Sequence, residues 1–206
     1  VHLGVLHILE DVGVRVLDED AFKILRDGGC EVDEESRMVW IPSSLVEEAI
    51  RWTPKQVTLY GRDPRDKVVL ERDRYYTVIG STTPYVLDPW TGERRRGGEE
   101  YVAMGARVAD ALPNIHVATQ CCLALDVAEK ISPRVQDIHE LAAVFMNTVK
   151  PVMVLAYSPE GVRRIVEMAA TIRGGLDNLR RQPFLFIYAE PTSPLQNSRE
   201  ALGNLI

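Results

Sequence analysis

An uninterrupted apolar run near the end of the chain constrains the fold more than any other stretch. Residues 183–195 read PFLFIYAEPTSPL, so the apolar run from Phe184 to Ala189 stops abruptly at Glu190. Because the run does not alternate polar with apolar residues, it predicts a strand covered on both faces, as parallel strands are. Folds with parallel strands bind ligands at the carboxyl ends of those strands, so Glu190 is a candidate functional residue.

Two earlier runs predict further buried strands. They cover 115–120 and 151–157, and helical patterns at 135–149 and 162–172 follow them. Strand starts that lie roughly 30–40 residues apart are typical of successive βα units with right-handed crossovers. A third helix is expected from residue 198. The pattern predicts an α/β fold, either a small open sheet or an incomplete (β/α)8 TIM barrel.

The end of the sequence inside an expected helix favours the second of these folds. A (β/α)8 barrel needs eight strands and usually about 250 residues, whereas the chain has 206 residues and shows three such strands. The chain begins at Val1 without a methionine and stops at Ile206 inside an expected helix. We therefore expect a piece of a longer protein that contains about the first three strands of a barrel.

The first half of the chain predicts a different organisation. Residues 1–55 read as helices with an extended insert near residues 37–41, and residues 56–96 read as short strands of a small antiparallel sheet or meander. Asp18 or Asp20 is expected to cap one helix, and Ser44 with Glu47 has the spacing of a capping box. We expect two parts, residues 1–97 and residues 98–206.

Composition excludes several classes of function. The chain has 30 acidic and 24 basic residues, and its one basic block is Arg94–Arg96, so a nucleic-acid groove is not expected. No apolar run is long enough to span a membrane, and the N-terminus is unlike a secretory signal. Three cysteines form no secreted disulfide framework. We expect a cytoplasmic protein whose open strand edges favour association, including a homo-oligomer.

Seven short stretches stand out along nearly the whole chain. In order they are GVRVLDEDAFKILRDGGCEVDE, IPSSLVEEAI, TLYGRDP, GSTTPYVLDPWTGERR, VADALPNI, NTVKPV and EPTSPLQNSREAL. Together they resemble the N-terminal part of the trimethylamine:corrinoid methyltransferase family. Proteins of this family are considerably longer (β/α)8 barrels. The resemblance implies that this chain supplies the leading segment and roughly the first three barrel strands.

The resemblance also implies an activity. A methyl group would pass from a methylated amine to the Co(I) of a corrinoid, of the cobalamin type, that a separate corrinoid protein carries. No cofactor would be bound directly. Family members with pyrrolysine act on trimethylamine, and some without it act on quaternary amines such as glycine betaine. The pyrrolysine position belongs to the family pattern beyond Ile206, so both substrates stay open.

The chemistry of such a transfer points to an acid among the candidates. Co(I) is a strong nucleophile, so the protein must hold an N-methyl carbon in line, exclude water and make the amine a competent leaving group. A quaternary nitrogen already leaves as a neutral amine, whereas a tertiary amine needs protonation or an adduct. Glu190 could hold the cation or act as general acid; alternatively it pairs with Arg199 or caps the helix expected near Ser198.

Aromatic and polar side chains supply candidate substrate contacts. Tyr157, Tyr188 and Tyr85 could form a cage around a methylated ammonium, at roughly 0.5–2 kcal/mol per ring; each also suits ordinary packing. Hydrogen bonds to the substrate could come from Gln120, Thr192 and Ser81, the last in a loop that permits close backbone approach. The alternative for Ser81 is a plain connecting loop, and the alternative for Thr192 is capping of the following helix.

No metal site is expected. Cys121 and Cys122 are adjacent and should point apart, and neither they nor His116 fall into a CxxC or HxxxH spacing. A rival of another class is a non-catalytic module that binds a methylated ammonium, or a truncated remnant. We expect this chain alone to be incomplete and inactive.

Overall fold

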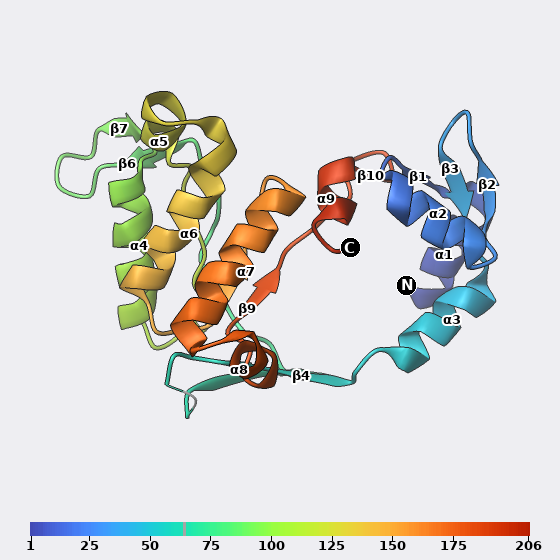
Figure 1. The fold of residues 1–206 in the computed structure, drawn as a ribbon, viewed down its shortest axis with the longest axis horizontal. Coiled ribbons are helices and arrows are strands. Elements are labelled where there is room, and N and C mark those ends of the chain that lie inside the picture. The colour runs from blue at the N-terminus through green and yellow to red at the C-terminus, as the bar shows by residue number, and fades with distance from the viewer. Residues whose placement is uncertain (64) are drawn as a thin grey trace. The chain divides into compact units, whose positions relative to one another are not determined.

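The computed structural model describes residues 1–63 and 65–206, which form two compact units (Figure 1). Unit 1 combines residues 1–55 with residues 189–206, and unit 2 comprises residues 56–188. The predicted division of the chain into residues 1–97 and residues 98–206 stays a prediction. Across the described residues, no helix is both long and apolar enough to cross a bilayer.

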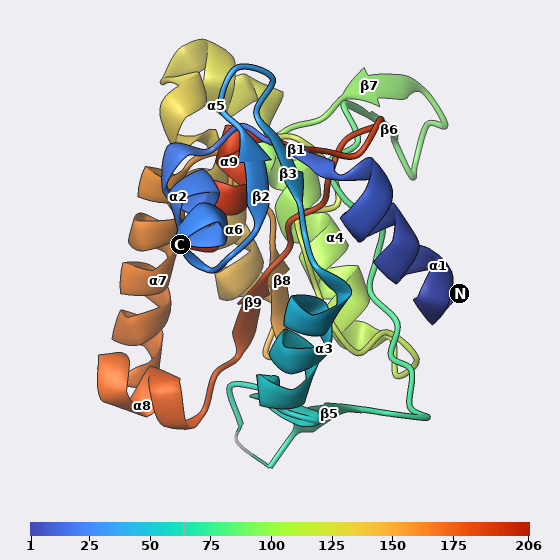
Figure 2. The same cartoon turned by 90° about the vertical axis from the view of Figure 1, so that its right-hand side faces the viewer.

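Unit 1 is a small sheet covered by helices (Figure 2). Its strand order is β10-β1-β3-β2, in which β1 pairs antiparallel with β3 and parallel with β10. The strands are β1 (Val14–Val16), β2 (Glu31–Asp33), β3 (Met38–Trp40) and β10 (Gln196–Asn197). The helices are α1 (His2–His7), the π-helical η1 (Ile8–Val12), α2 (Glu19–Asp27), α3 (Ser43–Trp52) and α9 (Arg199–Gly203). Apolar residues of β1, α2 and β3 form its core.

Helix ends in unit 1 follow the sequence signals in part. Asp18 caps α2 by accepting a hydrogen bond from the Ala21 amide at 2.9 Å, as predicted. The capping box expected from Ser44 and Glu47 is wrong, because Pro42 is the N-cap of α3 and Ser44 already lies inside the helix. The Ser43 hydroxyl instead donates to Glu10 across 2.5 Å, which ties α3 to η1.

Unit 2 contains four parallel segments in chain order. Val78 pairs with Val117 and Ala118 with Val152, and β8 (Val152–Val154) pairs along its length with β9 (Leu185–Ile187); all these pairings are parallel. The three predicted strands are therefore neighbours that run in the same direction. The fold is mixed α/β, and the described residues do not close a barrel.

Two predictions about these segments are wrong. Residues 74–80 were expected in an antiparallel meander, but Val78 joins the parallel segments through Val117. The run after Phe184 was expected to be covered on both faces, but β9 is only half-buried, while β8 is buried throughout. The reason is position: β8 has neighbours on both sides, whereas β9 pairs with β8 alone among the described residues.

Helices line one side of the parallel segments. In Figure 1, α4 (Glu99–Ala111), α6 (Gln136–Asn147) and α7 (Pro159–Arg173) lie side by side. Shorter helices accompany them: α5 (Leu125–Lys130) and the 3-10 turn η2 (Pro133–Val135) precede α6, and α8 (Leu176–Arg181) follows α7. The main core fills the space beneath these helices, with Val102, Leu141, Val144, Ile165 and Phe184 among its fully buried members.

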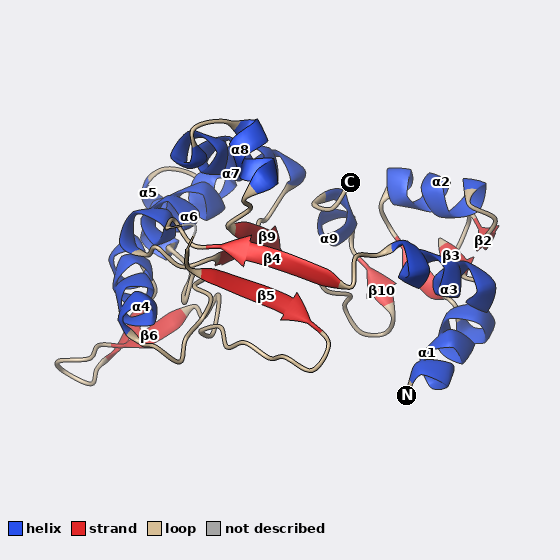
Figure 3. Cartoon of the chain, turned by 90° about the horizontal axis from the view of Figure 1, so that it is seen from below, coloured by secondary structure: helices blue, strands red, loops and turns tan. Residues whose placement is uncertain are grey.

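Two hairpins complete unit 2, and both are antiparallel as predicted. The first pairs β4 (Gln56–Tyr60) with β5 (Lys67–Glu71), drawn as the two long arrows of Figure 3. The second pairs β6 (Tyr85–Leu87) with β7 (Arg94–Arg96). This second hairpin directly precedes α4.

Candidate functional site

The carboxyl ends of the parallel segments gather polar residues at one edge of unit 2. We call the residues that follow these segments, 80–83, 119–124, 155–157 and 188, the strand-end edge. Four of the predicted site residues fall within it: Ser81, Gln120, Tyr157 and Tyr188. Because parallel strands end at the same edge of a sheet, residues from distant parts of the sequence become neighbours there.

The loop that carries Ser81 is fastened to the next segment by backbone hydrogen bonds. The Thr82 amide donates to the Gln120 carbonyl at 3.0 Å, and the Leu123 amide donates to the Thr83 carbonyl at 3.0 Å. The Thr83 hydroxyl also donates to the Cys121 carbonyl at 3.0 Å. Half-buried Ser81 is therefore held beside Gln120, as a shared site requires.

Gln120 uses its side chain to join two strand ends. Its Nε2 donates to the Leu155 carbonyl at 2.7 Å, and its Oε1 accepts from the Thr119 hydroxyl at 3.0 Å. The side chain is fully buried. Since both ends of the amide are engaged, the structure uses Gln120 to fix the spacing of the two strand ends.

Tyr157 is anchored to α6 by two carboxylates. Its hydroxyl donates to Glu140 Oε2 at 2.7 Å, and its amide donates to Asp137 Oδ2 at 2.9 Å. Glu140 Oε1 accepts two further hydrogen bonds, from the Ala124 amide at 2.6 Å and from Gln136 Nε2 at 2.8 Å. Glu140 thus clamps together the loops that follow two neighbouring strands.

Burial dominates the electrostatics of this cluster. Removal from water raises the pKa of the Glu140 carboxyl, against the opposing effect of its hydrogen bonds from Ala124, Tyr157 and Gln136. Burial, followed by the charge of Glu140, also raises the pKa of Tyr157 above that of a free phenol. Tyr157 therefore remains a neutral phenol whose hydroxyl donates a hydrogen bond to Glu140.

Sequence reasoning missed Gln136, Asp137 and Glu140. The apolar stripe predicts the helix but not that these polar residues are buried beside Leu141 and Val144. A signal existed, because positions 137, 140, 141 and 144 share one helical face. Space is also tight at this point: a side chain on Gly161 would place its Cβ 2.2 Å from Asp137 Oδ2.

Two predicted cage residues lie in different settings. The Tyr85 ring already faces a cation of the chain itself, since the Arg94 guanidinium lies 3.8 Å from the ring centroid. Tyr188 follows β9 at the strand-end edge and is 39% exposed. Among the described residues, no contact joins Tyr85 to Tyr157, so the structure does not support a shared cage of these two rings.

The remaining predicted residues, Glu190 and Thr192, belong to unit 1. The Thr192 amide donates to the Gln196 carbonyl at 2.7 Å and its carbonyl accepts from the Gln196 amide at 2.8 Å. This pairing closes the loop that leads into β10. Glu190 is exposed at the start of that loop, and its catalytic role stays a prediction.

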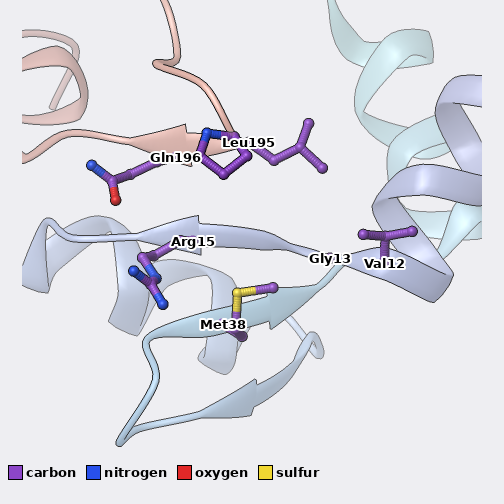
Figure 4. A pocket seen from close by; sticks show the side chains of 7 residues that line it. Val12, Gly13, Arg15, Met38, Leu195 and Gln196 are labelled. Carbon is purple, nitrogen blue, oxygen red and sulfur yellow. The ribbon is translucent and has the colours of Figure 1, made fainter.

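A pocket of about 310 Å³ lies within unit 1 (Figure 4). It is lined by Val12, Gly13, Arg15, Met38, Pro194, Leu195 and Gln196. In Figure 4, Leu195 and Gln196 lie on the side opposite Arg15 and Met38. A mainly apolar wall with a guanidinium does not suit a methylated ammonium, because the two cations would repel. The strand-end edge is therefore the better candidate site.

Comparison with known proteins identifies the family. The trimethylamine methyltransferase (MTTB) family matches residues 1–206. The chain is 32% identical to trimethylamine methyltransferase MttB of Desulfitobacterium hafniense (strain DSM 10664 / DCB-2), over 95% of this chain and 39% of that protein. It is 29% identical to trimethylamine methyltransferase MttB of Methanosarcina thermophila, over 100% of this chain and 43% of the relative.

A relative with a different substrate in its name matches equally far along the chain. Glycine betaine methyltransferase of Desulfitobacterium hafniense (strain Y51) is 26% identical over 100% of this chain and 42% of that protein. The chain thus spans about two fifths of the length of the relatives it matches. These matches confirm the resemblance found in the sequence, and the chain belongs to the trimethylamine methyltransferase family.

Proposed function

We propose that the chain is part of an enzyme that moves a methyl group from a methylated amine to the Co(I) of a corrinoid carried by a partner protein. The observation that carries this proposal is the family match over residues 1–206, together with relatives named as methyltransferases of trimethylamine and glycine betaine. Because the chain covers about two fifths of those relatives, the proposal concerns the longer protein.

The same proposal extends to the fold. The four parallel segments of unit 2 follow one another in chain order, and helices on one side connect the later ones. This is the arrangement of the opening strands of a (β/α)8 barrel. In the longer protein, the free side of β9 would pair with the next barrel strand.

The strand-end edge would then form part of the barrel mouth. The corrinoid supplies the nucleophile that takes the methyl group. The carbon–nitrogen bond would break with the electron pair staying on nitrogen: a quaternary nitrogen then leaves as a neutral amine, whereas a tertiary nitrogen does so only once it carries a proton. The Tyr157 ring would contact the methylated ammonium, Ser81 would donate a hydrogen bond, and Gln120 would hold the strand ends in register. Glu190 would hold the cation or give a proton to the departing amine.

The test is a methyl-transfer assay with the longer protein, its corrinoid partner in the Co(I) state, and either trimethylamine or glycine betaine. Substitution Glu190→Gln removes the charge and the proton while it keeps the size of the side chain. We expect it to lower the rate at least about 100-fold. The matched control, Glu200→Gln in the exposed first turn of α9, should leave the rate unchanged.

Each result of the assay separates the alternatives. Transfer from trimethylamine supports the first substrate, and transfer from glycine betaine alone supports the quaternary-amine enzyme. Saturable binding of either amine without transfer would support a non-catalytic binding module. An unchanged rate in the Glu190→Gln variant would remove Glu190 from the mechanism.

A further inference from the structure

Two adjacent thiols at the strand-end edge face the same helix. The Cys121 Sγ lies 3.4 Å from the Tyr101 carbonyl oxygen, and the Cys122 Sγ lies 3.8 Å from the Gly98 carbonyl oxygen. Both carbonyls belong to the start of α4 and stand three residues apart. The expectation that these neighbours point apart is therefore wrong, because both thiols reach carbonyl oxygens at the start of the same helix.

Glycines on facing segments make room for this arrangement. A side chain on Gly105 would place its Cβ 2.4 Å from the Cys121 Sγ, and one on Gly97 would lie 3.3 Å from the Cys122 Cβ. The pair thus occupies space that larger residues in α4 and before it would fill. Both cysteines are free thiols.

The two thiols differ in access and acidity. Cys121 is partly exposed, whereas Cys122 is fully buried. The hydrogen bond between the two thiols lowers the pKa of Cys121 and raises the pKa of Cys122. A partly exposed thiol that ionises more easily is the one that attacks first in thiol–disulfide exchange, and a buried neighbour is suited to react second.

We propose that Cys121 and Cys122 are a vicinal dithiol that closes into a disulfide when a small-molecule disulfide oxidises it. The Cys121 thiolate attacks one sulfur of the oxidant, forms a mixed disulfide and releases one thiolate. The Cys122 sulfur then attacks the Cys121 sulfur and expels the second thiolate, which takes the Cys122 proton. Two electrons pass from the dithiol to the oxidant, which leaves as two thiols.

The ring that forms is strained, so the oxidation is reversible. Neighbouring Cα atoms are about 3.8 Å apart across a trans peptide bond, whereas disulfides usually join Cα atoms about 4.4–6.8 Å apart. Strained disulfides have more oxidising potentials and belong to the labile, regulatory class. A modest excess of a thiol reductant should therefore reopen the ring.

Ring closure would act on the candidate site through one carbonyl group. The peptide bond between the two cysteines lies inside the ring, and its oxygen, that of Cys121, accepts hydrogen bonds from the Thr83 amide at 3.4 Å and the Thr83 hydroxyl at 3.0 Å. Closing the ring must turn this peptide group. The loop that carries Ser81 would then loosen, which couples oxidation to the strand-end edge.

The first experiment treats the chain with oxidised glutathione, then maps thiol modification by mass spectrometry. In the unsubstituted chain we expect the loss of two hydrogen atoms within the peptide that contains both cysteines, and no lasting glutathione adduct. Cys122→Ser should stop at a stable adduct on Cys121, and Cys121→Ser should react at neither position. Cys30 is the internal control, because burial raises the pKa of its thiol and should leave it unmodified.

A second readout needs no substitution. Amide hydrogen exchange at Leu123, whose amide donates to Thr83, should speed up in the oxidised chain and recover after reduction, while amides within α6 stay constant. A lasting adduct on Cys121 in the unsubstituted chain, or equal reaction of Cys122 in the Cys121→Ser variant, would overturn the dithiol. If the exchange rate of the Leu123 amide were the same in the reduced and the oxidised chain, the proposed coupling between the dithiol and the strand-end edge would be wrong.

Discussion

Glu140 is a buried carboxyl group whose oxygens are all used within the chain. It accepts from a backbone amide, a glutamine side chain and a phenol, at 2.6, 2.8 and 2.7 Å. An isolated buried charge is costly, and three donors offset much of that cost. At the scale of a single residue, the stability of the strand-end edge therefore depends on which atoms replace this carboxyl group.

Replacement of Glu140 should separate loss of hydrogen bonds from loss of charge. Glu140→Ala leaves the Ala124 amide and the Tyr157 hydroxyl unsatisfied, so we expect a loss of about 3 kcal/mol in the free energy of unfolding. Glu140→Gln keeps one acceptor oxygen and should cost about 1 kcal/mol. Urea unfolding followed by circular dichroism measures both. Glu167→Ala, on the exposed face of α7, is the control and should stay within about 0.5 kcal/mol; equal losses in all three variants would contradict the clamp.

The raised pKa of Glu140 defines how the free energy of unfolding changes with pH. Burial raises the pKa of folded Glu140 above its ordinary value of 4.5, so the folded protein binds this proton more tightly than the unfolded chain does. The contribution of this tighter proton binding to stability is fully present below pH 4.5 and is lost as pH rises through the pKa of folded Glu140. Unfolding free energies of wild type and Glu140→Gln, measured across this range, should therefore converge as pH rises. A gap that widens with pH would show that the pKa of Glu140 is lowered instead.

At the scale of elements, one lysine fastens the end of α4 to the start of the next strand. Lys150 Nζ donates to the carbonyls of Ala109, Leu112 and Ile115 at 2.7, 2.7 and 2.6 Å. These carbonyls lie at and beyond the C-terminus of α4, where orphan oxygens and the helix dipole favour a cation. The contact lies at the end of the parallel segments opposite the strand-end edge.

Removal of this cation should weaken unit 2 without touching the candidate site. We expect Lys150→Met, which keeps the length of the side chain, to lower the free energy of unfolding by about 2 kcal/mol, because three carbonyls lose their donor. Lys130→Met, on an exposed residue in the last turn of α5, should change it by less than about 0.5 kcal/mol. Chemical denaturation measures the free energy of unfolding of both variants. If Lys150→Met lowered it as little as Lys130→Met, water would be replacing the ammonium group as the donor to the three carbonyls.

The elements show which features a single sequence can predict. The apolar runs before Gln120, Tyr157 and Glu190 predicted three neighbouring parallel strands, because an unbroken apolar run is a clear signal of such a strand. The sequence carries no signal for the half-exposed state of β9, because that state depends on whether another strand pairs with its second edge. The Glu140 clamp and the facing thiols were missed for a similar reason: their partners come from distant loops and from local backbone geometry.

At the scale of the whole molecule, the free side of β9 tests the proposed barrel. Alternation along a parallel strand directs the amides of Leu185 and Ile187 away from β8. We expect both amides to exchange quickly in this chain and slowly in the longer protein, where another strand would accept their hydrogen bonds. The Tyr188 amide, which already donates to Val154 at 2.9 Å, is the matched control. Equally fast exchange of Leu185 and Ile187 in the longer protein would contradict a continuing barrel.

Unit 1 is assembled from both ends of this sequence, since β1 pairs with β10 across about 180 intervening residues. During synthesis on the ribosome, β1 therefore emerges long before its parallel partner. Unit 2 is continuous in sequence and can fold as soon as residue 188 has left the exit tunnel. Until β10 emerges, the apolar face of the first 55 residues lacks its last strand. The time during which a chaperone can bind this segment therefore depends on the rate of translation.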